Sequence, residues 1–131
     1  LLIDAGVHMP GLHAGDERRI ALEGYPGLLA RELIGARSYK SDERAKQTPA
    51  RGAARRELLA ALEQGRGRLG LHLMIDAGQR DALVADASGD RLDAVLCMLQ
   101  AAWACRRRNH GLPEAIDPLE GWIVTAGASP R

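Results

Sequence analysis

The strongest hydrophobic pattern in the chain lies between residues 92 and 103. Apolar residues recur there at steps of three and four, which predicts a helix with one buried face. This stripe consists of Leu92, Val95, Leu96, Leu99, Ala102 and Trp103. Ser88 or Asp90 can accept hydrogen bonds from the free N–H groups at the helix start, where acidic side chains also suit the helix dipole. We therefore expect a central helix with an acidic first turn.

Two earlier stretches also have helical spacing. Pro26 suits the first position of a helix that continues to about Ile34, and Gly35 suits its end. A second helix covers residues 53–63, or begins earlier if Thr48 is its cap and Pro49 its first residue. Residues 76–84 form a third helical stretch that leads into the acidic turn.

Strand signals are short and few. Residues 18–26 predict a brief strand that ends in a turn, and residues 122–125 predict a final strand or a docked tail segment. Residues 69–75 alternate in polarity and suit either a strand or the start of a helix. Glu23 would stand at the carboxyl end of a strand, where ligands of open α/β sheets collect, unless it is a solvated strand-end glutamate. The pattern indicates an α/β fold that is rich in helix and has a few short strands.

The length of 131 residues suits a single domain, or a fragment of a longer one. No apolar run reaches the length of a membrane span, so we expect no membrane partner. Cys97 and Cys105 lie eight residues apart on one predicted helix, too far for a disulfide, and indicate free thiols in a reducing cytoplasm. Because the chain begins at Leu1 without an initiator methionine, we expect it to be part of a longer protein.

Charge is distributed unevenly although the net charge is only +1. Residues 31–68 contain ten Lys or Arg against five Asp or Glu. This excess predicts a partner that bears phosphate, with Lys40, Arg44 and Lys46 as candidate contacts. The alternative is a solvated loop with ordinary helix-surface charges.

The candidate chemistry rests on carboxylates. Glu23 and the group of Asp86, Asp90 and Asp93 are the candidates, since clustered carboxylates repel one another unless they are protonated or share cations. Their hard oxygen atoms suit Mg²⁺ or Mn²⁺. Two such ions about 4 Å apart can activate water and stabilise the leaving oxygen of a phosphodiester. Acidic first turns are also common in helices that bind nothing, so capping and pairing with basic groups stays an alternative.

Several short motifs resemble one known family. Asp90–Ala94 followed by an apolar helix resembles the last acidic motif of RNase-H-like nucleases, especially Holliday-junction resolvases. More closely, four segments together resemble domain of unknown function family 429, a group of predicted RNase-H-like nucleases. These segments are residues 22–27, residues 39–41, the helix that begins with residues 90–94, and residues 121–124. The resemblance extends from about Ile20 to Thr125.

The resemblance implies roles for individual residues. Glu23 matches the second acidic position of the family, at the end of a core strand, and Asp90 and Asp93 match the last pair. These three would be catalytic, metal-binding carboxylates for Mg²⁺ or Mn²⁺. The family's first aspartate lies in an opening strand–turn–strand unit, which Asp4 does not match because no hairpin strands follow it. We therefore expect the C-terminal portion of an RNase-H-like domain, without its N-terminal strands.

Two functions remain in view. The first is a nuclease that depends on a divalent metal and hydrolyses phosphodiester bonds, with Lys40, Arg44 and Lys46 on the nucleic-acid backbone. The second is a non-catalytic module for nucleic-acid binding or assembly, which keeps the fold but has an incomplete site. An uncovered sheet edge would favour association into a homo-oligomer.

Overall fold

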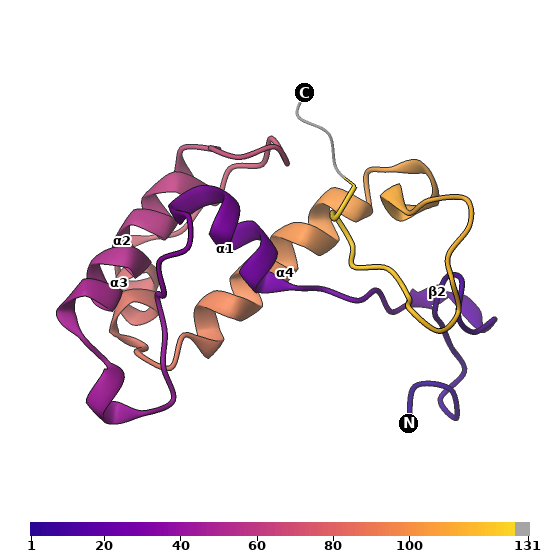
Figure 1. Ribbon diagram of the computed structural model, residues 1–131. Helices are drawn as coiled ribbons and strands as arrows, with labels where there is room; N and C mark the ends of the chain where they lie inside the picture. Colours follow the sequence, from indigo (N-terminus) through magenta and orange to yellow (C-terminus); the bar gives the residue numbers. More distant parts are fainter. Residues whose placement is uncertain (128–131) are drawn as a thin grey trace. The chain divides into compact units, whose positions relative to one another are not determined.

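The computed structural model describes residues 1–127 and shows a helix-rich α/β fold (Figure 1). The expected α/β class and high helix content are therefore confirmed. In the described part the strands are β1 (Val7–His8) and β2 (Asp16–Ile20), and the α-helices are α1 (Pro26–Ile34), α2 (Pro49–Glu63), α3 (Ala77–Ala85) and α4 (Asp90–Ala104). Two short 3₁₀ helices are η1 (Arg44–Lys46) and η2 (Arg108–Gly111). No helix within residues 1–127 combines the length and the apolar character that a membrane span requires.

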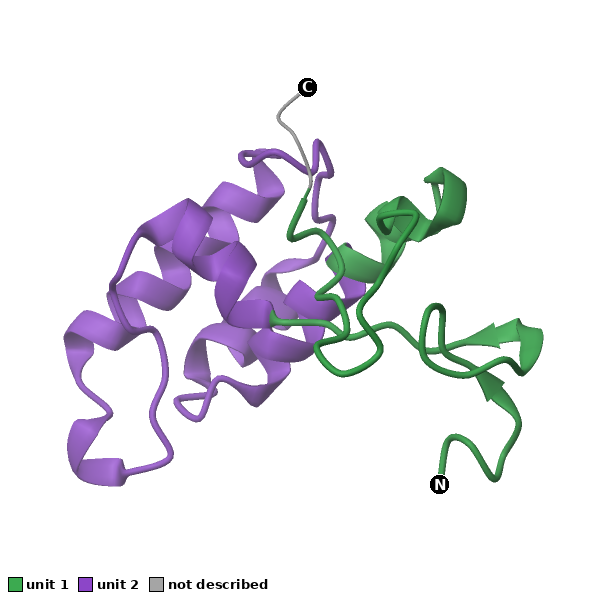
Figure 2. Ribbon diagram, turned by 45° about the vertical axis from the view of Figure 1, so that its right-hand side comes forward, with its two compact units in different colours: residues 1–25, 100–128 green, residues 26–99, 129–131 purple. Residues whose placement is uncertain are grey.

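The chain divides into two compact units, which Figure 2 colours separately. We call Pro26–Leu99 the helical unit. Leu1–Tyr25 and the described residues from Gln100 onward form the sheet unit. The boundary falls within α4, so the acidic first turn of that helix belongs to the helical unit.

The helices begin where the sequence provides caps. Pro26 starts α1, and Gly35 follows its last residue with a φ of 68°, a conformation that glycine adopts without strain. Thr48 accepts a hydrogen bond from the Arg51 amide, so α2 has the earlier of the two predicted starts. Asp76 and Gln79 form a reciprocal capping box at the start of α3.

Within the helical unit, α2 packs against both α1 and α3. The largest fully buried apolar side chains are Leu58 and Leu59 of α2 and Leu92 and Leu96 of α4, each with no exposed surface. The predicted stripe of α4 is therefore its buried face. Aliphatic residues supply most of this core, as expected of a chain without phenylalanine.

The expectation for residues 69–75 was wrong, because the segment is neither strand nor helix. Leu69 and Leu73 are buried, and the Leu73 amide donates to the Leu62 carbonyl near the end of α2 at 3.0 Å. Met74, by contrast, is 91% exposed. The alternating pattern arises because Leu69 and Leu73 pack into the core while the residues between them do not. An irregular segment that lies against a helix can therefore show this pattern without pairing with a strand.

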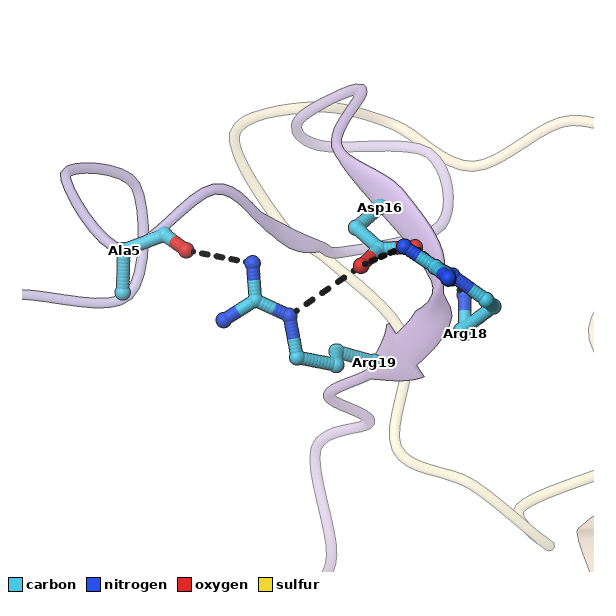
Figure 3. Close-up of polar contacts among 4 residues, drawn as sticks. All are labelled: Ala5, Asp16, Arg18 and Arg19. Atoms are coloured by element: carbon cyan, nitrogen blue, oxygen red, sulfur yellow. Dashed lines mark hydrogen bonds and ion pairs between the residues drawn. The ribbon is translucent and has the colours of Figure 1, made fainter.

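The sheet unit contains a short parallel pair, β1 with β2. The strand expected at residues 18–26 lies earlier, at Asp16–Ile20, and is mostly exposed. Polar contacts hold it (Figure 3): Asp16 accepts from Arg18 at 3.0 Å and from Arg19 at 3.3 Å, while Arg19 also donates to the Ala5 carbonyl at 2.8 Å. Hydrogen bonding from Arg18 lowers the pKa of Asp16. The strand is therefore defined by charge pairs, which an apolar pattern cannot detect.

The C-terminal segment of the sheet unit docks through single contacts. Ile123 forms an isolated parallel bridge with Glu23, and the Val124 amide donates to the Glu23 carbonyl at 2.8 Å. Buried Gln100 donates to the Val124 carbonyl at 3.2 Å and to the Thr125 hydroxyl at 3.0 Å. Of the two predictions for residues 122–125, the docked segment is therefore the closer one.

Candidate functional site around Asp93

Two carboxylates occupy the first turn of α4, those of Asp90 and Asp93. The Asp93 side chain is 19% exposed, whereas Asp90 is exposed. Asp93 follows fully buried Leu92, so its carboxylate lies at the edge of the core. A charged group in such a position needs partners, because partial burial removes hydration from it.

Tyr39 and Lys40 provide those partners from a segment more than fifty residues earlier. The Tyr39 hydroxyl donates to Asp93 Oδ1 at 2.5 Å, and the Lys40 ammonium forms a hydrogen-bonded ion pair with Asp93 Oδ2. Each carboxylate oxygen thus accepts from a different side chain. The structure brings together one candidate metal ligand and one candidate phosphate contact.

The backbone around Gly89 permits this close approach. The Ser41 amide donates to the Ala87 carbonyl at 3.2 Å, which holds the segment of Tyr39 and Lys40 against the loop before α4. Gly89 has a φ of 78°, and a Cβ at this position would lie 2.5 Å from the Lys40 Cβ. Both the conformation and the space therefore require glycine here.

Buried Arg55 of α2 holds the backbone of Tyr39 in place. Its guanidinium donates to the Tyr39 carbonyl at 2.7 Å and to the Val84 carbonyl near the end of α3 at 2.8 Å. The side chain is only 6% exposed, and burial lowers its pKa. Arg55 thereby ties the Tyr39 segment to two helices.

Of the two residues expected to cap α4, Ser88 does accept a hydrogen bond from a free amide, but Asp86 accepts the shorter ones. Asp86 performs most of the capping, since its Oδ2 accepts from the Arg91 amide at 3.0 Å and its Oδ1 accepts from the Ser88 hydroxyl at 2.7 Å. Ser88 in turn accepts from the Asp90 amide at 3.5 Å. These contacts lower the pKa of Asp86, chiefly through the Arg91 amide. Capping of α4 thus accounts for an aspartate at position 86. It does not account for the aspartates at positions 90 and 93.

The electrostatics of the cluster follow from its contacts. The hydrogen bond to Asp93 raises the pKa of Lys40, and the negative charges of Asp90 and Asp42 act in the same direction. Burial raises the pKa of the Cys97 thiol, one turn further along α4, and the charge of Asp93 adds to this effect. Lys40 is therefore held in its charged form and Cys97 in its neutral form.

The other predicted site residues have separate surroundings. Arg44 and Lys46 lie exposed on η1, and Lys46 pairs with Glu43 at 2.6 Å. Glu23 belongs to the sheet unit, whereas Asp90 and Asp93 belong to the helical unit. Glu23 lines a mostly apolar cavity of about 210 Å³ with Leu22, Trp122 and other residues of the sheet unit.

The donor set of α4 can be compared with the needs of a metal ion. No group of three His, Cys, Asp or Glu side chains that could hold a metal is present within residues 1–127. Mg²⁺, however, commonly binds through one or two carboxylates together with waters and substrate phosphates. Asp90 and Asp93 supply two hard carboxylates in one helical turn, of which Asp90 is exposed and Asp93 is already paired with Lys40.

Sequence reasoning missed Tyr39, Arg55 and Gly89 as parts of this cluster. The burial of Arg55 could have been predicted from the sequence. Arg55 lies one helical turn before Leu58 and Leu59, on the same face of α2. Tyr39 is the sole aromatic residue in the basic stretch 31–68, and a buried anchor is a usual role for such a residue.

Comparison with known proteins found no relative of this chain. No protein-family model, curated protein or solved structure matches the chain.

Proposed function

We propose that the chain is the C-terminal portion of an RNase-H-like domain and acts in a divalent-metal-dependent nuclease that hydrolyses phosphodiester bonds. One observation carries the proposal: Asp93 is partly buried, oriented by Tyr39 and paired with Lys40, so that a candidate metal ligand and a candidate phosphate contact meet. Both belong to segments that carry the family resemblance. The segments around Glu23 and Ile123, which carry the rest of it, also pair.

In this proposal Asp90 and Asp93 would hold Mg²⁺ or Mn²⁺, and the resemblance separately gives Glu23, in the sheet unit, a catalytic role. When bound, the metal activates water and stabilises the charge on the leaving oxygen. Tyr39 keeps the Asp93 carboxylate oriented through its bond to Oδ1. Lys40 supplies positive charge for the substrate phosphate, and exposed Arg44 and Lys46 extend the contact along the nucleic-acid backbone.

The test is cleavage of branched and linear DNA and RNA with Mn²⁺, using the full-length protein and its Asp93→Asn variant. We expect cleavage that EDTA abolishes and that Asp93→Asn reduces by at least about tenfold to a hundredfold, the range for losing a group that supports a metal ligand. Asp81→Asn, which removes an exposed carboxylate from α3, is the matched control and should cleave normally. Undiminished cleavage by Asp93→Asn would refute the assignment.

A second function, a non-catalytic module for nucleic-acid binding or assembly, is favoured by a different property of the same pair. Lys40 already neutralises Asp93, which gives the carboxylate a purely structural use. Such a module would bind DNA or RNA with an affinity that falls with salt, through its basic residues, and would cleave neither. Nucleic-acid binding that Asp93→Asn leaves intact, together with no cleavage at any Mn²⁺ concentration, would identify this alternative.

We also propose a reducing compartment such as the cytoplasm. Cys97 and Cys105 are both free thiols, and Cys105 is exposed. Exposed free thiols are usual where glutathione and thioredoxin keep cysteine reduced. Quantitative labelling of both cysteines by a thiol reagent in freshly lysed cells would support this placement.

A further inference from the structure

We propose that the cavity beside Glu23 binds a small organic ammonium ion, whose apolar body fills the cavity and whose charged group pairs with the Glu23 carboxylate. The cavity belongs wholly to the sheet unit, which Figure 2 draws in green, and it shares no residue with the Asp93 cluster. The inference therefore does not rest on the proposed nuclease. It gives Glu23 a role that requires no metal ion.

The size and the lining of the cavity suit an apolar body. Its volume is about 210 Å³, and an apolar cavity of roughly 150 Å³ holds a benzene molecule. Apart from Glu23, the described residues that line it are apolar. Leu2 and Leu12 line it and are nevertheless 50% exposed, and Trp122 is 38% exposed. An apolar guest would cover this surface favourably, because water there finds few polar partners.

Glu23 determines the charge of the guest. It is the one charged side chain among the described residues that line the cavity, and within residues 1–127 its carboxylate has no hydrogen-bond or ion-pair partner. A lone carboxylate offers a metal ion too few ligands, whereas an ammonium group donates charge-assisted hydrogen bonds to it. Trp122 adds an aromatic ring to the lining, and aromatic rings attract organic cations. The chemistry therefore favours a cation with an apolar body.

Backbone contacts fix the part of the wall that carries Glu23 and Trp122. The Val124 amide donates to the Glu23 carbonyl at 2.8 Å, and Ile123 forms a parallel bridge with Glu23. Fully buried Gln100 holds the same segment to α4, since it donates to the Val124 carbonyl at 3.2 Å. The carboxylate and the indole are thus presented by a preformed wall, as in most ligand sites.

A tight loop fixes another part of the wall. Met9 and His13 exchange two backbone hydrogen bonds, of 2.9 and 2.8 Å. Within this loop Gly11 approaches Ile116 so closely that a Cβ at position 11 would lie 2.8 Å from the Ile116 Cβ. Met9 and Ile116 both line the cavity, so this close packing sets its shape.

The test titrates the full chain at neutral pH with three probes that share a phenylethyl body and differ in charge. They are 2-phenylethylamine, 2-phenylethanol and 3-phenylpropionate, a cation, a neutral molecule and an anion. Trp103 and Trp122 are the two tryptophans of the chain and give two indole N–H signals in ¹H–¹⁵N spectra. The Trp122 signal should shift saturably with the amine, and the Trp103 signal, from outside the cavity lining, should move less. We expect the amine to bind roughly fivefold more tightly than the alcohol, as a partly exposed ion pair allows, and the anion to give no saturable shift.

Variants separate the charge of the site from its apolar volume. Glu23→Gln should weaken binding of the amine roughly fivefold and leave binding of the alcohol unchanged. Glu17→Gln, which neutralises an exposed carboxylate on β2 of the same unit, is the matched control and should bind both probes as the wild type does. Ala21→Leu places a larger side chain in the cavity lining and should weaken binding of both.

The probe series on the wild type decides the question even if a variant fails to fold. Equal affinities for the amine and the alcohol would show that the carboxylate selects nothing and would overturn the inference. A Trp122 signal that shifts saturably with no probe would overturn it as well. Either result leaves the nuclease proposal intact, because that proposal is tested by Mn²⁺-dependent cleavage and Asp93→Asn.

Discussion

The hydroxyl of Tyr39 donates a hydrogen bond to Asp93 Oδ1 across 54 positions of sequence. Tyr39 itself is buried, with 6% of its surface exposed. The bond joins an irregular segment to the first turn of α4 and fixes a partly buried carboxylate. We therefore expect both the stability of the helical unit and the orientation of the Asp93 carboxylate to depend on this bond.

Tyr39→Phe removes this donor and keeps the aromatic ring. We expect the free energy of unfolding to fall by about 1.5–3 kcal/mol, the usual range for a hydrogen bond to a charged group. Tyr25→Phe is the matched control, because Tyr25 is 48% exposed, and it should change stability by less than about 0.5 kcal/mol. Urea unfolding measures both variants. Equal stabilities of the two would show that the Tyr39 hydroxyl contributes nothing.

Arg55→Lys tests the support behind Tyr39. The guanidinium serves two carbonyls in different directions, and a lysine ammonium on a flexible stem cannot reproduce that fork. One buried carbonyl is then left without a donor, so we expect a loss of about 1–3 kcal/mol. The control is Arg56→Lys, on the exposed face of the same helix, which should be nearly neutral. Equal midpoints in urea unfolding would contradict the assignment.

Gly89→Ala combines backbone strain with a steric clash, and Gly35→Ala separates the two. Both glycines have a positive φ, of 78° and 68°, but a Cβ at Gly35 meets nothing within 4 Å. We expect Gly35→Ala to cost about 1–2 kcal/mol from the left-handed conformation alone. Gly89→Ala should cost more and should also displace Lys40, detected as a shift of its ¹³Cε signal. A smaller loss at Gly89 than at Gly35 would contradict the described packing.

The cap of α4 predicts a dependence of stability on pH. The folded pKa of Asp86 lies below its ordinary value of 3.8 because the ionised carboxylate accepts from the Arg91 amide and the Ser88 hydroxyl. Its contribution is therefore complete above pH 3.8, and it is lost as the pH falls through the folded pKa.

Asp86→Ala should accordingly lower the free energy of unfolding by about 1 kcal/mol at neutral pH, as loss of a cap does. The difference from wild type should shrink as the pH falls below 3.8. Asp81→Ala, on the exposed face of α3, controls for loss of one negative charge. A difference between wild type and Asp86→Ala that grows on acidification would contradict the assigned capping role.

The helices were the predictable part of the fold because their signals are local. Pro26 with Gly35, and Thr48 with Pro49, mark the ends of α1 and the start of α2 through contacts within one turn. The strands were poorly predicted because β2 is held by Asp16, Arg18 and Arg19 and lacks an apolar face. The prediction for residues 69–75 was wrong for the opposite reason: the segment has an apolar pattern but is not a strand. Its buried residues Leu69 and Leu73 give it the alternation that is typical of one.

The candidate site was predictable in part. The spacing of Asp90 and Asp93 placed both carboxylates in one turn without knowledge of the fold. The partner of Asp93 could not be read from the sequence, because Lys40 lies 53 positions away and was expected to contact nucleic acid. The structure shows that these segments meet, through the Ser41 and Ala87 backbones and through the contacts of Tyr39 and Lys40 with Asp93.

The central claim is that Asp93 is a metal ligand and not only one half of an ion pair. Calorimetric titration of the full-length protein with Mn²⁺, compared among wild type, Asp93→Asn and Asp81→Asn, tests it most directly. We predict that wild type and Asp81→Asn bind Mn²⁺ with the same affinity and that Asp93→Asn loses this binding. If Asp93→Asn is less stable yet binds Mn²⁺ as the wild type does, the carboxylate serves only the structure, and the claim is wrong.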